Sequence, residues 1–130
     1  MEKKEPVPIK FQPDKTLVKL FAKVVVTAKQ FPGVVESRSY GTPAIKVKER
    51  LIARLRSEAE GGLALRCNVI KREMLLMSAP ETFYITDHYE NSSYILINLG
   101  TANWNAMPDI IERAWLLIAS PKLIKEYEMR

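Results

Sequence analysis

Apolar and basic residues alternate along the chain from Ser39 to Cys67, and this is the strongest pattern in the sequence. Successive side chains of a strand point to opposite faces, so a period of two predicts a turn followed by three short antiparallel strands. The positions expected to face a core are Ile45, Val47, Leu51, Ala53, Leu55, Leu63, Leu65 and Cys67. The positions expected to face outward are Lys46, Lys48, Arg50, Ile52, Arg54, Arg56, Ala64 and Arg66. The alternation slips by one residue at 48–50, which predicts a tight hairpin there.

Helical periodicity lies on both sides of these strands. Asp14 is a candidate N-cap for a helix over about residues 15–30, and Pro32-Gly33 ends it. Near the other end of the chain, apolar residues at helical spacing predict a helix over about 107–119. Residues 122–127 are expected to add one more short helix.

The middle of the chain predicts a helix and two further strands. Asn68 is a candidate cap for a helix over 69–77, whose core positions are expected to be Ile70, Met74 and Met77. Residues 82–86 and 94–99 alternate with a period of two, and this predicts a fourth and a fifth strand. Residues 34–40 are interpreted as either an edge strand or an irregular connector.

The element order α-β-β-β-α-β-β-α predicts an α+β domain of two layers, with helices on one face of a five-stranded antiparallel sheet. We expect a single domain over residues 14–130. Residues 1–13 contain three prolines and several charges, so a flexible arm is expected there. Two layers would leave the second face of the sheet open to solvent.

The open face is the main candidate site. If the five strands share one sheet, it gathers cations and aromatic side chains: Lys46, Lys48, Arg50, Arg54, Arg56, Arg66, Tyr84 and Tyr94. Cations interleaved with aromatic rings suit a nucleic-acid backbone with stacked bases. The alternative is a solvated face whose arginines pair with acidic residues, namely Glu36, Glu49, Glu58 and Glu60. Both interpretations stay open.

Composition adds modest constraints. The 130 residues carry a formal net charge of +5, which is compatible with nucleic acid or another polyanion as partner. A single cysteine excludes an internal disulfide and favours a reducing compartment. No apolar run has the length of a membrane helix, and the first residues lack the apolar core of a signal peptide. We therefore expect a soluble cytoplasmic protein with no membrane partner.

Catalytic chemistry is not indicated. The one histidine, His88, follows Asp87, but adjacent residues on an extended chain point apart and do not form a catalytic pair. Cys67 falls on the expected core face, so it is not a candidate nucleophile. One histidine and one cysteine do not make a metal site. We expect no enzyme activity, no catalytic residue, no cofactor and no metal.

Several sequence blocks resemble a known family. FPGVVESRSYGTPAIKV, RLIARLR, LALRCN and PETFYITDHY, followed by a late AW in a helix, look like the MmcQ/YjbR family of small bacterial proteins. The resemblance covers roughly residues 17–125. It implies an α-β(3)-α-β(2)-α fold, like that of type III secretion chaperones, and a family often labelled DNA-binding. The chain departs from the family pattern at Ile45, where an aromatic is common, and at Asn68-Val69, where Asp-Pro is common.

Two of these family blocks are expected to meet at one edge of the sheet, as a structural clasp or a small pocket: Tyr40, Gly41, Thr42, Pro43, Asp87, His88 and Tyr89. Three functional hypotheses follow. The first is sequence-nonspecific binding of double-stranded DNA, or another polyanion, on the basic face. The second is a protein-interaction or chaperone-like module, monomeric or weakly dimeric. The third is a small-ligand binder around the clasp residues.

Overall fold

The structure, a computed structural model, describes residues 15–56 and 62–130. The flexible arm expected over 1–13 and the expected cap Asp14 lie outside the described residues. The elements follow one another as α1 (Lys15–Ala28), β1 (Val34–Ser39), β2 (Thr42–Val47), β3 (Arg50–Leu55), β4 (Leu63–Arg66), α2 (Val69–Ser78), β5 (Phe83–Tyr84), the 3₁₀ helix η1 (Asp87–Tyr89), β6 (Tyr94–Ile97), α3 (Met107–Leu116) and α4 (Pro121–Glu128).

The strands form one antiparallel sheet in the order β1-β2-β3-β4-β6-β5. The predicted α+β class is confirmed, with six strands where the pattern indicated five. The added strand is β1, which pairs with β2 over its whole length. The two-residue loop between them, Tyr40-Gly41, has positive φ at both positions, 54° and 77°, and this geometry matches the twist of the flanking strands. Residues 34–39 are therefore an edge strand, one of the two interpretations left open by the sequence.

A β-bulge in β3 changes which residues face the core. The pairing of β2 with β3 shifts between Ile45 and Lys46, so that Ile45 lies opposite Ala53 whereas Lys46 lies opposite Leu51. Ile52 is the extra residue of the bulge, and both Ile52 and Ala53 are fully buried in the main core. The prediction that Ile52 faces outward and Leu51 inward is wrong, because the alternation slips inside the strand and not at the hairpin.

The second half of the sheet is shorter than predicted. The strand expected over 82–86 is reduced to β5, and the chain then turns into η1. The strand expected over 94–99 ends at Ile97, after which Gly100 and Thr101 form a turn held by the Asn98 side chain and carbonyl. Side-chain and backbone bonds of this kind compete with the sheet ladder and end it.

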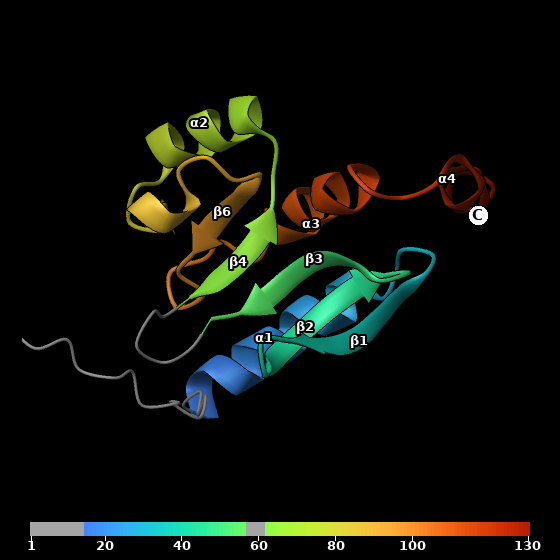
Figure 1. The fold of residues 1–130 in the computed structure, drawn as a ribbon, viewed down its shortest axis with the longest axis horizontal. Helices are drawn as coiled ribbons and strands as arrows, with labels where there is room; N and C mark the ends of the chain where they lie inside the picture. The colour runs from blue at the N-terminus through green and yellow to red at the C-terminus, as the bar shows by residue number, and fades with distance from the viewer. Residues whose placement is uncertain (1–14, 57–61) are drawn as a thin grey trace, which may run out of the picture.

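The main core lies between the sheet and the helices. Figure 1 shows α1 and α3 on the far side of the sheet, where they contact each other. The core includes fully buried side chains from the strands and α3, among them Ile45, Leu55, Leu65, Ile95 and Trp115. Trp115 also fixes the turn after α1: its Nε1 donates a hydrogen bond to the Pro32 carbonyl at 2.9 Å, and its ring stacks on Phe31.

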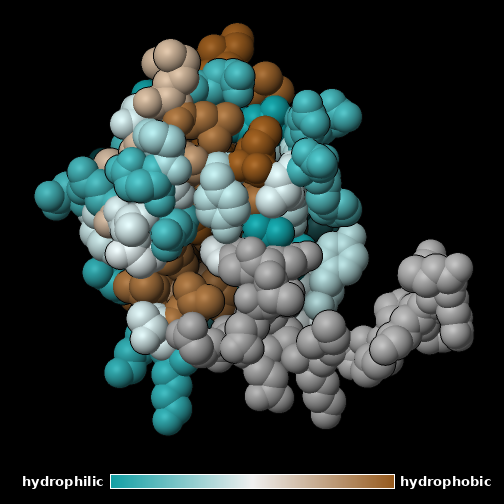
Figure 2. All heavy atoms as spheres, turned by 90° about the vertical axis from the view of Figure 1, so that its left-hand side faces the viewer, coloured by the Kyte–Doolittle hydropathy of each residue, from teal (hydrophilic) through white to brown (hydrophobic). Residues whose placement is uncertain are grey.

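Helix α2 is rotated relative to the prediction. Asn68 caps it as expected, since its side chain accepts a hydrogen bond from the Lys71 amide at 2.7 Å. The side chains expected in the core are exposed instead: Ile70, Met74 and Met77. Figure 2 shows hydrophobic spheres at the top of the molecule, where α2 lies in Figure 1. The helix buries Arg72 and Leu75, because this orientation brings the Arg72 guanidinium to backbone carbonyls of the loop after η1.

Candidate functional site

The face of the sheet opposite the main core carries most of the predicted cations. One row of paired residues crosses it from strand to strand, formed by Arg54, Ala64, Leu96 and Tyr84. In neighbouring rows Arg66 lies beside Tyr94, and Lys46 lies beside Leu51. We call this surface the arginine–tyrosine face, and it comprises Tyr40, Lys46, Arg54, Arg56, Arg66, Tyr84, Tyr89 and Tyr94.

Lys48 and Arg50 do not belong to this face, in contrast to the sequence prediction. Lys48 lies in the two-residue loop between β2 and β3, with a φ of 49°. Arg50 pairs with Val47, which faces the main core. Both line a depression on the helix side, together with residues of the α3–α4 connection such as Ser120. For Arg50 the bulge is the cause, because it interrupts the alternation between Arg50 and Arg54.

Arg54 connects two tyrosines from distant parts of the chain. Its guanidinium carbon lies 5.3 Å from the centre of the Tyr40 ring, and its Nη2 donates a hydrogen bond to the Tyr89 hydroxyl at 3.1 Å. Tyr40 is 89% exposed at the tip of the β1–β2 loop. A guanidinium held over an aromatic ring combines cation–π attraction with fixed orientation. Arg54 is therefore half-buried and oriented, while the ring beside it faces solvent.

The two sequence blocks expected to converge meet through this arginine. Tyr40 belongs to the first block and Tyr89 to the second. Thr42 is buried, and its hydroxyl donates to the Ser39 carbonyl at 2.8 Å, which tightens the loop that carries Tyr40. Asp87 and His88 are exposed in η1, and the His88 ring packs edge-on against Tyr89. A single bridging side chain between two loops favours the clasp interpretation over the pocket.

Arg66 and Arg56 are also stacked on tyrosines, with different exposure. The Arg66 guanidinium lies 5.2 Å from the Tyr94 ring centre and donates to the Leu51 carbonyl at 2.8 Å and to the Tyr94 hydroxyl at 3.2 Å. Arg56 lies 5.2 Å from the Tyr89 ring centre but is only 4% exposed. Arg66 is half-buried and reachable from solvent, whereas Arg56 is part of the packing beneath Tyr89.

A buried arginine of α2 positions Tyr89. The Arg72 guanidinium donates hydrogen bonds of 2.8–3.2 Å to four backbone carbonyls, those of Tyr89, Glu90, Ser92 and Tyr94. Charge-assisted bonds of this kind order a loop that has little regular structure. The loop in turn places the Tyr89 ring against Ala64 and Leu96, forming a small second core on this face. In Figure 1 η1 lies beside β6 and below α2, as this tether requires.

The hydroxyl of Tyr94 adds no negative charge near neutral pH. Burial raises the pKa of Tyr94 above its ordinary value of 10.0, and the Arg66 guanidinium lowers it in part. Of the acidic residues considered as partners for the arginines, Glu36 forms an ion pair with Lys29 at 3.3 Å, on α1's side of the sheet. Glu58 and Glu60 lie outside the described residues. Among the described residues, Glu36 is thus paired with a lysine and not with an arginine of this face.

Sequence reasoning did not assign Tyr40 and Tyr89 to the basic face, and it did not identify Arg72. Tyr40 follows an edge strand that the sequence pattern left ambiguous. The contact of its ring with Arg54 could therefore not be predicted. Arg72 lies in a helix whose apolar residues suggested a different buried side. The one sequence signal for Arg72 is its position three residues before Leu75, on a helix with two competing apolar stripes.

A two-layer α+β fold, with an antiparallel sheet and loops tied across its second face, defines the structural class. The sequence model of the YjbR family matches residues 29–117, and the chain belongs to that family. No curated protein matches the chain.

One solved structure is similar, that of the Deinococcus radiodurans protein DR2400, described as a DUF419 family domain. It superposes with a TM-score of 0.66 at 18% sequence identity, covering 83% of this chain and 87% of that protein. This similarity establishes the fold. Within the described part of the chain, every helix is too short or too polar to cross a lipid bilayer.

Proposed function

We propose that the protein binds nucleic acid without sequence preference through the arginine–tyrosine face. The observation that carries this proposal is the pairing of half-buried arginines with tyrosine rings on an open strand surface, Arg54 with Tyr40 and Arg66 with Tyr94. Arginine binds phosphate through its planar fork of donors, and aromatic rings stack on bases. Family membership is compatible with this proposal but does not specify a ligand.

Preorganisation supports the choice of this face over the exposed lysines elsewhere. The Arg66 side chain is held by a ring and two hydrogen bonds, so it loses little rotamer freedom when it meets a phosphate. A free lysine on a helix surface has no such restraint and gives up more conformational entropy. Contacts to phosphate carry little sequence information, which is why nonspecific binding is proposed.

The structure lowers the number of phosphate contacts expected from the sequence. Arg56 is buried and Lys48 and Arg50 lie on the other side of the sheet. Three cations of the arginine–tyrosine face are half-buried and reachable, namely Lys46, Arg54 and Arg66. Neutralisation of about three phosphates gives a log–log salt slope of roughly −3 on duplex DNA.

The test is fluorescence anisotropy of a labelled random-sequence duplex titrated with the protein across a salt series. A slope of about −3, together with equal affinity for unrelated sequences, supports the proposal. Absence of binding at the lowest salt would overturn it.

A labelled single strand of the same length, measured beside the duplex, shows whether base stacking contributes. Tyr40→Ala should then weaken single-strand binding more than duplex binding, because only unpaired bases can stack on the exposed ring. The size expected for loss of one stacked base is about 1–3 kcal/mol.

A further inference from the structure

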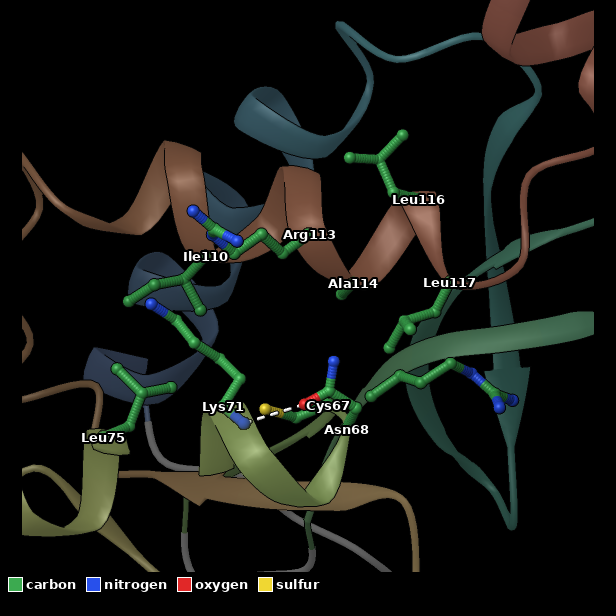
Figure 3. Close-up of a pocket in the computed structure, with 10 residues that line it drawn as sticks. Cys67, Asn68, Lys71, Leu75, Ile110, Arg113, Ala114, Leu116 and Leu117 are labelled. Atoms are coloured by element: carbon green, nitrogen blue, oxygen red, sulfur yellow. Dashed lines mark hydrogen bonds between the residues drawn. The ribbon is translucent and has the colours of Figure 1, made fainter. Parts of the chain in front are cut away.

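A cavity of about 210 Å³ lies on the helix side of the molecule, between the start of α2 and the face of α3. It is separate from the arginine–tyrosine face, and nucleic-acid binding does not use it. Its walls are mainly apolar, formed by Leu75 from α2 and by Ile110, Ala114 and Leu117 from α3. Figure 3 shows these side chains around the opening, with Leu116 at its edge.

The polar groups at this cavity are cationic or neutral. Lys71 extends from α2 toward α3 in Figure 3, and Arg113 approaches the same side from α3. In the part of the chain described, no carboxylate forms an ion pair with Lys71, whereas Arg113 pairs with Asp109 at the surface, Nε to Oδ2 at 3.0 Å. The lining residues include no aspartate or glutamate.

Cys67 closes the inner end of the cavity and stays uncharged near neutral pH. Burial raises the pKa of its thiol, although Arg72 and Lys71 lower it in part. Arg66 also borders the cavity, but its guanidinium is turned to the other face, where it contacts Leu51 and Tyr94.

From this arrangement we propose that the cavity binds a small carboxylate with an apolar tail. The carboxylate pairs with Lys71, with Arg113 as a second donor, and the tail occupies the space between Leu75, Ile110 and Leu117. The cavity is smaller than the roughly 300–1,000 Å³ of sites that hold drug-sized ligands. A nucleotide is therefore too large, and a short fatty acid or an aryl-acetic acid is of the right class.

A charged group at the end of an apolar cavity provides both affinity and selectivity for an amphipathic anion. Apolar walls give affinity through burial of the tail, and the single ammonium selects the anion over its neutral analogue. Phenylacetate and hexanoate are suitable probes, and phenylacetamide is the neutral isostere of the first.

The experiment is a titration of ¹⁵N-labelled full-length protein with phenylacetate, hexanoate and phenylacetamide, followed by amide chemical shifts. Saturable shifts confined to the residues around the cavity, with phenylacetamide at least about tenfold weaker than phenylacetate, are expected. Equal binding of the acid and the amide, or shifts located elsewhere, would overturn the proposal. Absence of saturation up to the solubility limit of both acids would overturn it too.

Two variants sharpen the assignment. Lys71→Gln should lower phenylacetate affinity about tenfold or more and leave the weak phenylacetamide binding unchanged. Lys122→Gln, an equal change of charge on α4, is the matched control and should leave both unchanged. Ala114→Leu fills the cavity and should abolish binding of both probes. Retained affinity in Lys71→Gln would contradict the proposed pairing, even if Ala114→Leu failed to fold.

Discussion

The two faces of the sheet are held in different ways. On the helix side, close-packed apolar side chains such as Leu65, Ile95 and Trp115 meet with no exposed surface. On the other side a few apolar residues, Ala64, Leu96 and Tyr89, are covered by arginines stacked on tyrosines. The first face gains stability from burial of apolar area, and the second gains it from oriented cation–aromatic and hydrogen-bonded contacts.

The difference shows that an arginine near the arginine–tyrosine face can have one of two roles. Arg56 and Arg72 are buried and serve the fold, because they pack under Tyr89 or satisfy loop carbonyls. Arg54 and Arg66 are half-buried with their guanidinium groups fixed by neighbouring rings. Charge count alone does not separate the two roles, whereas exposure and contacts do.

The largest expected effect comes from breaking the helix-side face. Trp115→Ala removes a fully buried ring and its hydrogen bond to the Pro32 carbonyl. We expect a loss of about 3–5 kcal/mol in the free energy of unfolding, measured by urea denaturation. A loss below about 1 kcal/mol would show that this core is not packed as described.

The next effect is on the tyrosine side. Arg72→Met removes the donor of four backbone carbonyls while keeping the stem length. The expected loss is about 2–3 kcal/mol, and it should be accompanied by faster hydrogen exchange in η1 and β6. Unchanged exchange in η1 would contradict the tether. Lys71→Gln, the neighbouring change, serves as the control for helix α2 itself.

Alkaline pH should probe both faces at once. The folded-state pKa values of Cys67 and Tyr94 are raised above 9.0 and 10.0, so the folded protein keeps these protons to higher pH than the unfolded chain. Stability is therefore complete below pH 9 and falls as the pH rises through the folded pKa values, by at most about 1.4 kcal/mol per pH unit for each group.

Single variants assign that pH dependence to one face or the other. Cys67→Ala should remove the onset near pH 9, on the helix side, and Tyr94→Phe the later part, on the tyrosine side. Urea denaturation under reducing conditions across pH 7–11 measures both. A pH profile that neither variant changes would exclude these two groups as its source.

The smallest effect separates the two stripes of α2. Met74 is exposed, so Met74→Glu should change the free energy of unfolding by less than about 0.5 kcal/mol. Leu75→Glu places a charge in the buried stripe and should cost several times more. If Met74→Glu lowered the thermal stability more than Leu75→Glu, helix α2 would have the orientation that the sequence predicted.

The sequence predicted the fold better than it predicted the site. Alternation along residues 39–67 is strong enough to define three strands, and the Asn68 cap and the last helix followed from short-range chemistry. The bulge at Ile52 could not be predicted from the sequence. An extra residue in the strand leaves the flanking residues apolar or basic, as they would be in a regular strand. The same bulge moved Arg50 off the predicted basic surface.

Tertiary contacts decided the remaining site residues. Helix α2 offers two apolar stripes of similar strength, and the choice between them depends on loop carbonyls some twenty residues away that Arg72 satisfies. Tyr40 and Tyr89 lie 49 positions apart in the chain and meet only through Arg54. No local pattern encodes such a meeting.

A matched pair of charge reversals tests whether the arginine–tyrosine face binds nucleic acid. Lys46→Glu on that face and Lys122→Glu on α4 lower the formal net charge of +5 by the same amount. In low-salt anisotropy with duplex DNA, we predict about a tenfold loss of affinity for Lys46→Glu and less than about a twofold loss for Lys122→Glu. Equal losses, or none in either variant, would show that nucleic acid does not bind through this face.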